Sequence, residues 1–321
     1  MTLEQRFRQL LEQGALELPA LGEGNTPRRL RLLADLARED VSLGRLAEAH
    51  ADALQILREA GRPPSPGATY GVWAAEDPTL SLTLCRSGAT WVLEGTKVFC
   101  TGADLVDRAL VTVRTPQPML IDVDLRTHRS RIDSDSSSWI TPAFADTSTA
   151  VVRFRALELE PDPLVGPAGW YLERPGFWNG ACGPAACWAG GAQGLIRWAL
   201  QRSAAGAANP LRDAAAGALS ALASQMDGVL DHAGQAIDRE PHDRLAAQIR
   251  ALQTRHCIER ACNETIDRFG RAFGPRPLAF DADLHRRVLE VQLYIRQCHA
   301  ERDLQALGAA LRERAAQNVD A

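Results

Sequence analysis

The chain has 321 residues, of which 45% are hydrophobic and 24% are charged, a composition typical of a folded protein with two or three packed units. Its net charge is -4 and its basic residues are scattered, which argues against a nucleic-acid partner. Seven cysteines without CxxC spacing favour a reducing compartment over a disulfide framework or a zinc site. The sequence lacks a signal peptide and any apolar run of about 18 residues, so we expect a cytoplasmic protein without a membrane partner.

Residues 1–67 are predicted to form an N-terminal helical region. Thr26 and Pro27 suit the N-cap and first position of one helix. Ser42 suits the N-cap of a second helix, in which leucines recur at helical spacing. The Gly- and Pro-rich stretch 61–67 ends this region.

Residues 68–160 are predicted to form a central antiparallel β-domain, because short runs rich in Val, Thr and Leu alternate with turn residues. Gly95 suits a turn, so runs 91–93 and 97–101 are predicted to form a hairpin. Phe99 and Thr101 would then share one face of the sheet, and Cys100 would point to the other face. The polar segment 133–149 is predicted to be an exposed connection.

Residues 170–321 are predicted to form a C-terminal four-helix bundle. Its helices are expected near 178–203, 211–236, 242–270 and 282–312, separated by breaks that contain proline. The first helix begins with a stretch dense in small residues, 181–194. Small residues allow either a flat ligand or another helix to approach closely, and the sequence leaves both interpretations open.

Two motifs in the β-domain resemble those of acyl-CoA dehydrogenases. In that family a strand ending in Thr-Glu-Pro precedes a segment reading Leu-x-Gly-x-Lys-x-Trp-Ile-Thr. Here the first motif is Ala75-Glu76-Asp77-Pro78, and the second runs from Leu93 to Thr101 as LEGTKVFCT. With the order of helices, β-domain and helical bundle, this resemblance implies an α+β protein with the acyl-CoA dehydrogenase-like fold and an FAD cofactor.

The resemblance also implies where FAD would lie. The backbone after the first strand and the edge bearing Phe99 and Thr101 would meet the flavin ring, which needs an apolar wall and a few polar groups. A C-terminal segment would contact the cofactor as well. The residues implied to bind FAD are Trp73, Ala74, Ala75, Phe99, Cys100, Thr101, Arg296 and Gln297.

No catalytic residue is identified by the sequence. The family's usual base is a glutamate that follows a tyrosine, and alignment on Tyr294 places Ile295 there, which cannot accept a proton. Glu173 is the nearest carboxylate to an alternative base position, and it is interpreted as a solvated loop residue. His299 invites comparison with flavin monooxygenases of the same fold, but its charged neighbours favour a solvated helix face.

These observations predict an FAD-dependent oxidoreductase acting on an acyl thioester or a related small organic substrate. Two alternatives stay open: a flavin-dependent monooxygenase on the same fold, and a non-catalytic binding or assembly module. No metal site is expected, because no histidines are paired at metal-binding spacing. A homo-oligomer, either a dimer or a tetramer, is expected because the resemblance implies a cofactor site completed by a neighbouring subunit.

Overall fold

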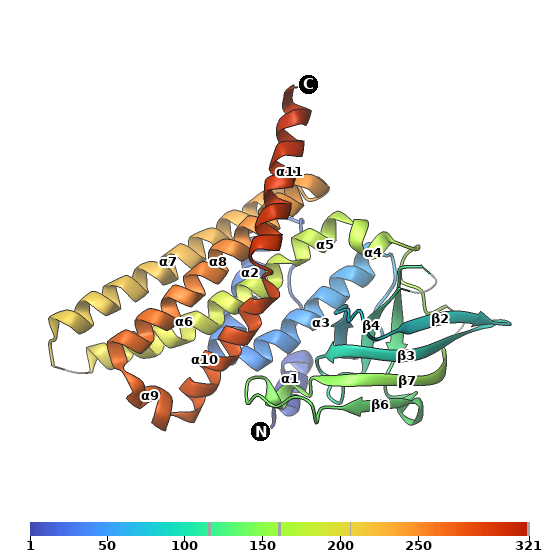
Figure 1. The fold of residues 1–321 in the computed structure, drawn as a ribbon, viewed down its shortest axis with the longest axis horizontal. Helices are drawn as coiled ribbons and strands as arrows, with labels where there is room; N and C mark the ends of the chain where they lie inside the picture. Colours follow the sequence, from blue (N-terminus) through green and yellow to red (C-terminus); the bar gives the residue numbers. More distant parts are fainter. Residues whose placement is uncertain (115–116, 160–161, 206, 320–321) are drawn as a thin grey trace. The chain divides into compact units, whose positions relative to one another are not determined.

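The computed structural model describes residues 1–114, 117–159, 162–205 and 207–319. The chain forms two compact units (Figure 1). Residues 1–17 and 46–177 form the first, called the β unit here, and residues 18–45 and 178–321 form the second, called the helical unit. N-terminal helices, a set of strands and C-terminal helices follow one another along the chain, which confirms the predicted α+β class. Among the described residues, no helix is long and apolar enough to cross a lipid bilayer.

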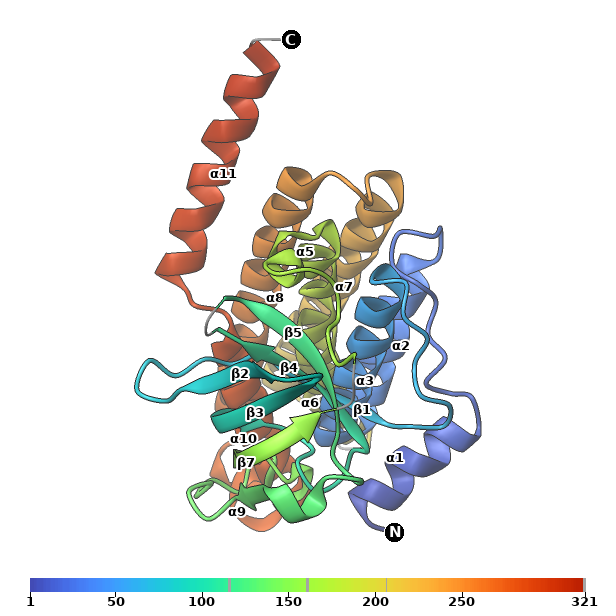
Figure 2. The same ribbon diagram turned by 90° about the vertical axis from the view of Figure 1, so that its right-hand side faces the viewer.

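The β unit contains two sheets. One has the order β1-β4-β5, made by Tyr70–Trp73, Arg108–Val113 and Met119–Asp124, and Figure 2 shows β4 and β5 side by side. The other has the order β2-β3-β7-β6, made by Leu82–Ser87, Thr90–Cys100, Ala150–Leu159 and Ile132–Asp135, and its strands are stacked in this order in Figure 1. The strand pairs are antiparallel, as predicted, with the exception of β1 and β4, which are parallel.

The predicted hairpin around Gly95 is wrong. β3 is one continuous strand that pairs with both β2 and β7, and the register against β7 shifts between Leu93 and Gly95. Gly95 has a φ of 126°, and a Cβ at this position would lie 2.1 Å from the carbonyl oxygen of Ser81. A glycine with positive φ can form a β-bulge as well as a turn. Gly95 forms a bulge inside β3 and not the predicted turn.

The segment 133–149 is more ordered than an exposed connection. Its first residues, up to Asp135, belong to β6, and a 3-10 turn, η2 (Ala145–Thr147), precedes β7. Phe144 is buried, and the indole Nε1 of Trp139 donates to the carbonyl oxygen of Ala143 at 2.8 Å. The predicted exposure holds for residues 133–138 and for Ile140, which is 94% exposed.

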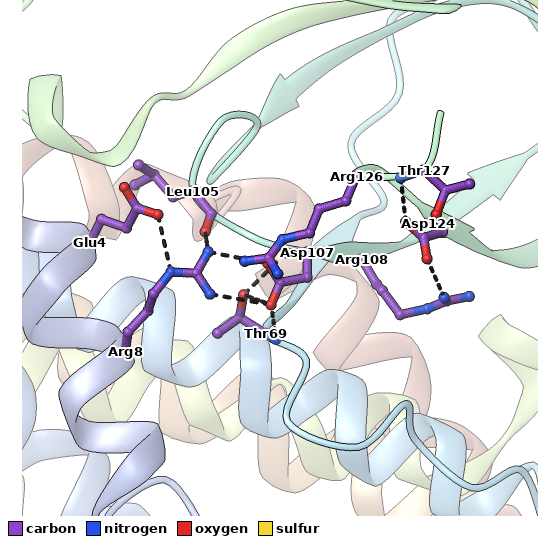
Figure 3. A network of polar contacts seen from close by, with 9 residues as sticks. All are labelled: Glu4, Arg8, Thr69, Leu105, Asp107, Arg108, Asp124, Arg126 and Thr127. Atoms are coloured by element: carbon purple, nitrogen blue, oxygen red, sulfur yellow. Dashed lines mark hydrogen bonds and ion pairs between the residues drawn. The ribbon is translucent and has the colours of Figure 1, made fainter. Parts of the chain in front are cut away.

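A buried carboxylate ties helix α1 (Leu3–Glu12) to the start of β4 (Figure 3). Asp107 accepts hydrogen bonds from Arg8 Nη2 at 3.1 Å and from the backbone N–H of Thr69 at 2.9 Å, and it pairs with Arg126. Burial on its own would raise the pKa of Asp107, but the hydrogen bonds from Arg8 and Thr69 lower this pKa below its ordinary value. The carboxylate therefore stays ionised and holds three segments of the β unit together.

The helical unit contains α2 (Thr26–Glu39) from the N-terminal part of the chain and a series of C-terminal helices. The latter are α6 (Cys182–Ala204), α7 (Pro210–Arg239), α8 (Arg244–Phe273), α9 (Pro275–Phe280), α10 (Ala282–Tyr294) and α11 (Glu301–Val319). The chain also has α3 (Val41–Glu59), α4 (Trp170–Glu173), α5 (Pro175–Gly180) and the short turns η1 (Arg129–Arg131) and η3 (Ile295–Gln297). Figure 1 shows α6, α7 and α8 side by side. Asn209 and Asp243 cap α7 and α8 with their side chains, close to the predicted boundaries.

Three predicted helix features are wrong in detail. The N-cap of α2 is Asn25 rather than Thr26, and the hydroxyl of Thr26 instead donates to Asp238 of α7 at 2.5 Å. Ser42 is not a cap, because α3 begins at Val41 and the side chain of Asp40 accepts from the N–H of Leu43 at 3.1 Å. Such shifts of one or two residues reflect competition between adjacent polar side chains for the same backbone groups.

The third error is the single helix predicted over 282–312. α10 ends at Tyr294, and α11 starts only at Glu301. Ala300 has a φ of 47°, and the N–H of His299 donates to Asp303 Oδ2 at 2.9 Å. The Asp303 carboxylate thus caps a new helix start.

The small residues of α6 serve helix packing. A Cβ on Gly190 would lie 2.0 Å from the carbonyl oxygen of Ala34 in α2, and one on Gly191 would lie 2.7 Å from Cγ2 of Val291 in α10. Of the two interpretations left open by the sequence, close helix contact is the one observed at these two glycines.

Candidate active site

The two motif segments predicted to share a site meet in the β unit. The indole of Trp73, at the end of β1, is buried, and its Nε1–H donates to the carbonyl oxygen of Thr101 at 3.0 Å. Gly71 leaves room for this contact, because a Cβ there would lie 3.0 Å from Trp73 Nε1. The ends of β1 and β3 are therefore fixed to each other.

Phe99 is an exposed aromatic residue in a strained backbone conformation. Its φ is 53° and its side chain is 59% exposed, although a left-handed conformation costs a non-glycine residue about 1–2 kcal/mol. The ring of Trp139 meets it edge-on, with ring centroids 6.4 Å apart and an interplanar angle of 87°. Such strain is typical of functional sites.

Phe99 and Thr101 do not share one face of the sheet, contrary to the prediction. The register of β3 against β7 shifts between Lys97 and Cys100, so the alternation of side chains is interrupted. Phe99 is exposed, whereas Thr101 is only 9% exposed.

Cys100 and Thr101 present different chemistry. Cys100 is buried, and burial raises the pKa of its thiol, so the sulfur stays protonated and offers no nucleophile. Thr101 Oγ1 accepts from Thr149 Oγ1 at 3.1 Å, and Thr149 Oγ1 lies 2.9 Å from Thr147 Oγ1. Thr147 and Thr149 were missed in the sequence, where their spacing just before a strand was the only signal.

An ion pair between the buried Lys97 and the exposed Glu76 joins the two motifs. Lys97, the chain's single lysine, is 3% exposed. Its Nζ donates to Glu76 Oε1 at 2.7 Å and to Thr112 Oγ1 and O at 2.8 and 3.0 Å. Burial lowers the pKa of Lys97, and the hydrogen bond to Glu76 opposes this shift. The segment after β1, which includes Ala74 and the half-buried Ala75, is thereby tied to β4.

The C-terminal positions lie in the helical unit. Ile295, at the usual base position, is fully buried. Arg296 Nη2 donates to Glu259 Oε1 at 2.7 Å and to Asn263 Oδ1 at 3.3 Å, which neutralises its charge locally. The carbonyl oxygen of Gln297 accepts from Arg255 Nη2 at 2.6 Å.

Other candidate acid–base groups are engaged or exposed. Glu173 is exposed in α4, and the side chain of His299 is 60% exposed and lies 3.4 Å from Asp303. Glu290, on α10, is buried and accepts a hydrogen bond from Ser42 Oγ at 2.7 Å. Glu290 therefore serves contacts inside the helical unit.

The sequence matches no protein-family model and no curated protein, but solved structures resemble it. Dibenzothiophene monooxygenase TdsC from Paenibacillus sp. A11-2 is 16% identical, with a TM-score of 0.73 and 95% of this chain and 94% of that chain covered. KijD3, solved with FMN and a dTDP-linked amino keto sugar, is 14% identical, with a TM-score of 0.77 and coverage of 98% and 86%. Methanesulfinate monooxygenase MsuC from Pseudomonas fluorescens is 16% identical, with a TM-score of 0.72 and coverage of 96% of both chains.

The chain has the acyl-CoA dehydrogenase-like fold.

This result confirms the fold that the β-domain motifs implied. At identities of 14–16%, these structures show a shared fold. The structures of TdsC and KijD3 contain FMN, whereas the sequence resemblance implied FAD.

Proposed function

We propose that this protein is a flavin-dependent oxidoreductase that acts on a small organic substrate. The observation that carries the proposal is Phe99, whose aromatic ring is exposed at the end of β3 although its backbone has a strained positive φ. With Thr101 and the backbone from Trp73 to Ala75, it provides the apolar wall and polar groups that an isoalloxazine ring requires. When bound, a flavin supplies hydride or oxygen chemistry, and the protein supplies position and electrostatics.

The choice between FAD and FMN belongs to this proposal. The sequence resemblance favours FAD, while the FMN found in TdsC and KijD3 favours the shorter cofactor. Arg296 and Gln297, in the helical unit, stay predictions of the sequence resemblance, and Arg296 already pairs with Glu259. We propose FMN, since its single phosphate requires fewer cationic partners than a diphosphate.

Within this class, a monooxygenase reaction has the better support. Dehydrogenation of an acyl thioester requires a base that removes a proton from carbon, and the buried Ile295 cannot act as one. TdsC and MsuC are both monooxygenases. An acyl thioester, which the sequence resemblance implied, is therefore the less favoured substrate.

Titration of the purified protein with FMN and with FAD, followed by visible absorbance, tests the proposal. Phe99→Gly removes the ring and relieves the positive φ, so we expect flavin affinity to fall roughly tenfold while the free energy of unfolding rises by about 1 kcal/mol. Phe280→Gly is the matched control, because Phe280 is 84% exposed on α9.

Equal flavin affinities of the wild type and Phe99→Gly would contradict the placement of the ring. Absence of saturable binding of either flavin would favour a non-catalytic module. Oxygen consumption by the reduced flavoprotein with substrate supports the monooxygenase, whereas anaerobic bleaching by acyl thioesters would show dehydrogenation instead.

A further inference from the structure

A cavity of about 370 Å³ lies in the β unit beside the end of β1. Its walls come from the segment after β1, the end of β4, the start of β5 and the segment around α4 and α5. Apolar side chains dominate the lining, including Met119, Leu120, Tyr171, Leu172 and Phe177. The volume falls within the range of roughly 300–1,000 Å³ that small-molecule sites occupy.

A carboxylate held by two hydrogen bonds also lines the cavity. Glu76 lines the cavity, and its Oε1 accepts from Lys97 Nζ at 2.7 Å and from Thr112 Oγ1 at 2.8 Å. In the part of the chain that the structure describes, Oε2 of Glu76 has no hydrogen-bond partner. Because Lys97 and Thr112 hold the other oxygen, the Glu76 carboxylate is a preorganised acceptor for a donor group on a ligand.

The charges around the cavity select against ions. Lys97 already neutralises Glu76, and Arg114, also in the lining, adds a positive charge that disfavours a cation. Arg114 would attract an anion, but an anion would also meet the Glu76 carboxylate and lose its hydration in an otherwise apolar cavity, at a cost in repulsion and desolvation. A neutral molecule with a hydrogen-bond donor avoids both penalties.

We propose that this cavity binds a small, neutral, apolar molecule that carries one hydroxyl or N–H group, which donates to Glu76. Ala74 belongs both to the cavity wall and to the residues proposed to meet the flavin, so the cavity adjoins the proposed flavin edge. The bound molecule is then the substrate of the proposed reaction, and this assignment of its role rests on the proposed function.

Equilibrium dialysis of the 321-residue chain without added flavin tests the site. The probes are 2-naphthol and 2-methoxynaphthalene, which share a ring system but differ in the donor. We expect 2-naphthol to bind at least tenfold more tightly, because a hydrogen bond to a charged acceptor is lost in the ether. Equal affinities for the two probes would overturn the role of Glu76.

A substitution in the cavity wall provides a second test of the site. Leu172 is 51% exposed at the cavity, so Leu172→Trp fills the space without disturbing the core, and we expect it to weaken 2-naphthol binding at least tenfold. Leu80→Trp is the control, since Leu80 is 40% exposed in the β unit and lies outside the cavity lining. Unchanged binding in Leu172→Trp would overturn the assignment of the cavity.

Flavin titration of the same samples separates the two proposals. A protein that binds flavin but neither probe retains the proposed function and loses this cavity as its substrate site. A protein that binds 2-naphthol but no flavin retains the binding site and loses the oxidoreductase assignment.

Discussion

His50 is a buried imidazole whose protonation is coupled to the folding of the β unit. It is 1% exposed, and its Nδ1 accepts from the backbone N–H of Tyr70 at 3.2 Å. The ring of Phe7 meets it edge-on at 6.0 Å between centroids. Among the described residues its Nε2 has no hydrogen-bond partner. Burial lowers the pKa of His50 to about 4, although the nearby Asp107 carboxylate opposes this shift.

We predict that this histidine makes folding stability depend on pH. Between its ordinary pKa of 6.5 and its folded pKa of about 4, the unfolded chain binds a proton that the folded chain does not. The free energy of unfolding therefore falls as the pH decreases through this window, by about 3 kcal/mol from this residue. Urea denaturation between pH 4 and 7 measures it against His50→Gln, which keeps an acceptor but does not titrate. Parallel pH profiles for the two proteins would show that the coupling is absent.

Single residues also mark the limit of what the sequence predicts. Ile295 was identified as the replacement for a base from its position beside Tyr294, and its side chain is buried. The positive φ of Phe99 had no signal, because aromatic residues rarely adopt it. The pairing of Lys97 with Glu76 required the three-dimensional structure, since the two residues belong to separate motifs.

Helix α6 can pack closely against α2 because Gly190 has no side chain. Gly190→Ala would place a methyl group 2.0 Å from the carbonyl oxygen of Ala34, so the helices must separate. We predict a loss of about 1–3 kcal/mol in the free energy of unfolding. Gly217→Ala, in α7, is the control, because a Cβ there meets no atom within 4 Å, and its better helix propensity should add about 0.5–1 kcal/mol.

Denaturant titration of the two glycine variants measures both effects. If Gly190→Ala were as stable as Gly217→Ala, the small residues of α6 would not serve close packing. Their role would then have to be sought in ligand contact, which is the other interpretation that the sequence allowed.

Helix boundaries could be predicted from the sequence where the capping residue and the helix start are adjacent in the chain. The caps at Asn209 and Asp243 come with adjacent proline or turn residues, and α7 and α8 begin near their predicted starts. The break between α10 and α11 was missed, because the residues from Cys298 to Asp303 are compatible with a continuous helix. The bulge at Gly95 was missed because register depends on the partner strand β7, which the local pattern does not contain.

For the whole molecule, the order of elements and two short motifs were sufficient to predict the fold. Both motifs lie in segments whose ends are fixed by specific contacts, Trp73 with Thr101 and Lys97 with Glu76, which explains why these residues carry the resemblance. The division into ranges 1–67, 68–160 and 170–321 stays a proposal. The cofactor and substrate depend on side chains that differ between proteins of one fold.

We predict that the protein forms a homo-oligomer, either a dimer or a tetramer. Helix α11 exposes Leu304 and Leu311, at 38% and 44%, and apolar residues aligned on one helix are typical of surfaces that associate. Light scattering at micromolar concentration should give two or four times the chain mass of 34.9 kDa. The double variant Leu304→Glu and Leu311→Glu should lower this mass, whereas Leu211→Glu on α7, at an 83% exposed position, should not. A wild-type mass of a single chain would contradict the prediction, and an unchanged mass in the double variant would place the interface elsewhere.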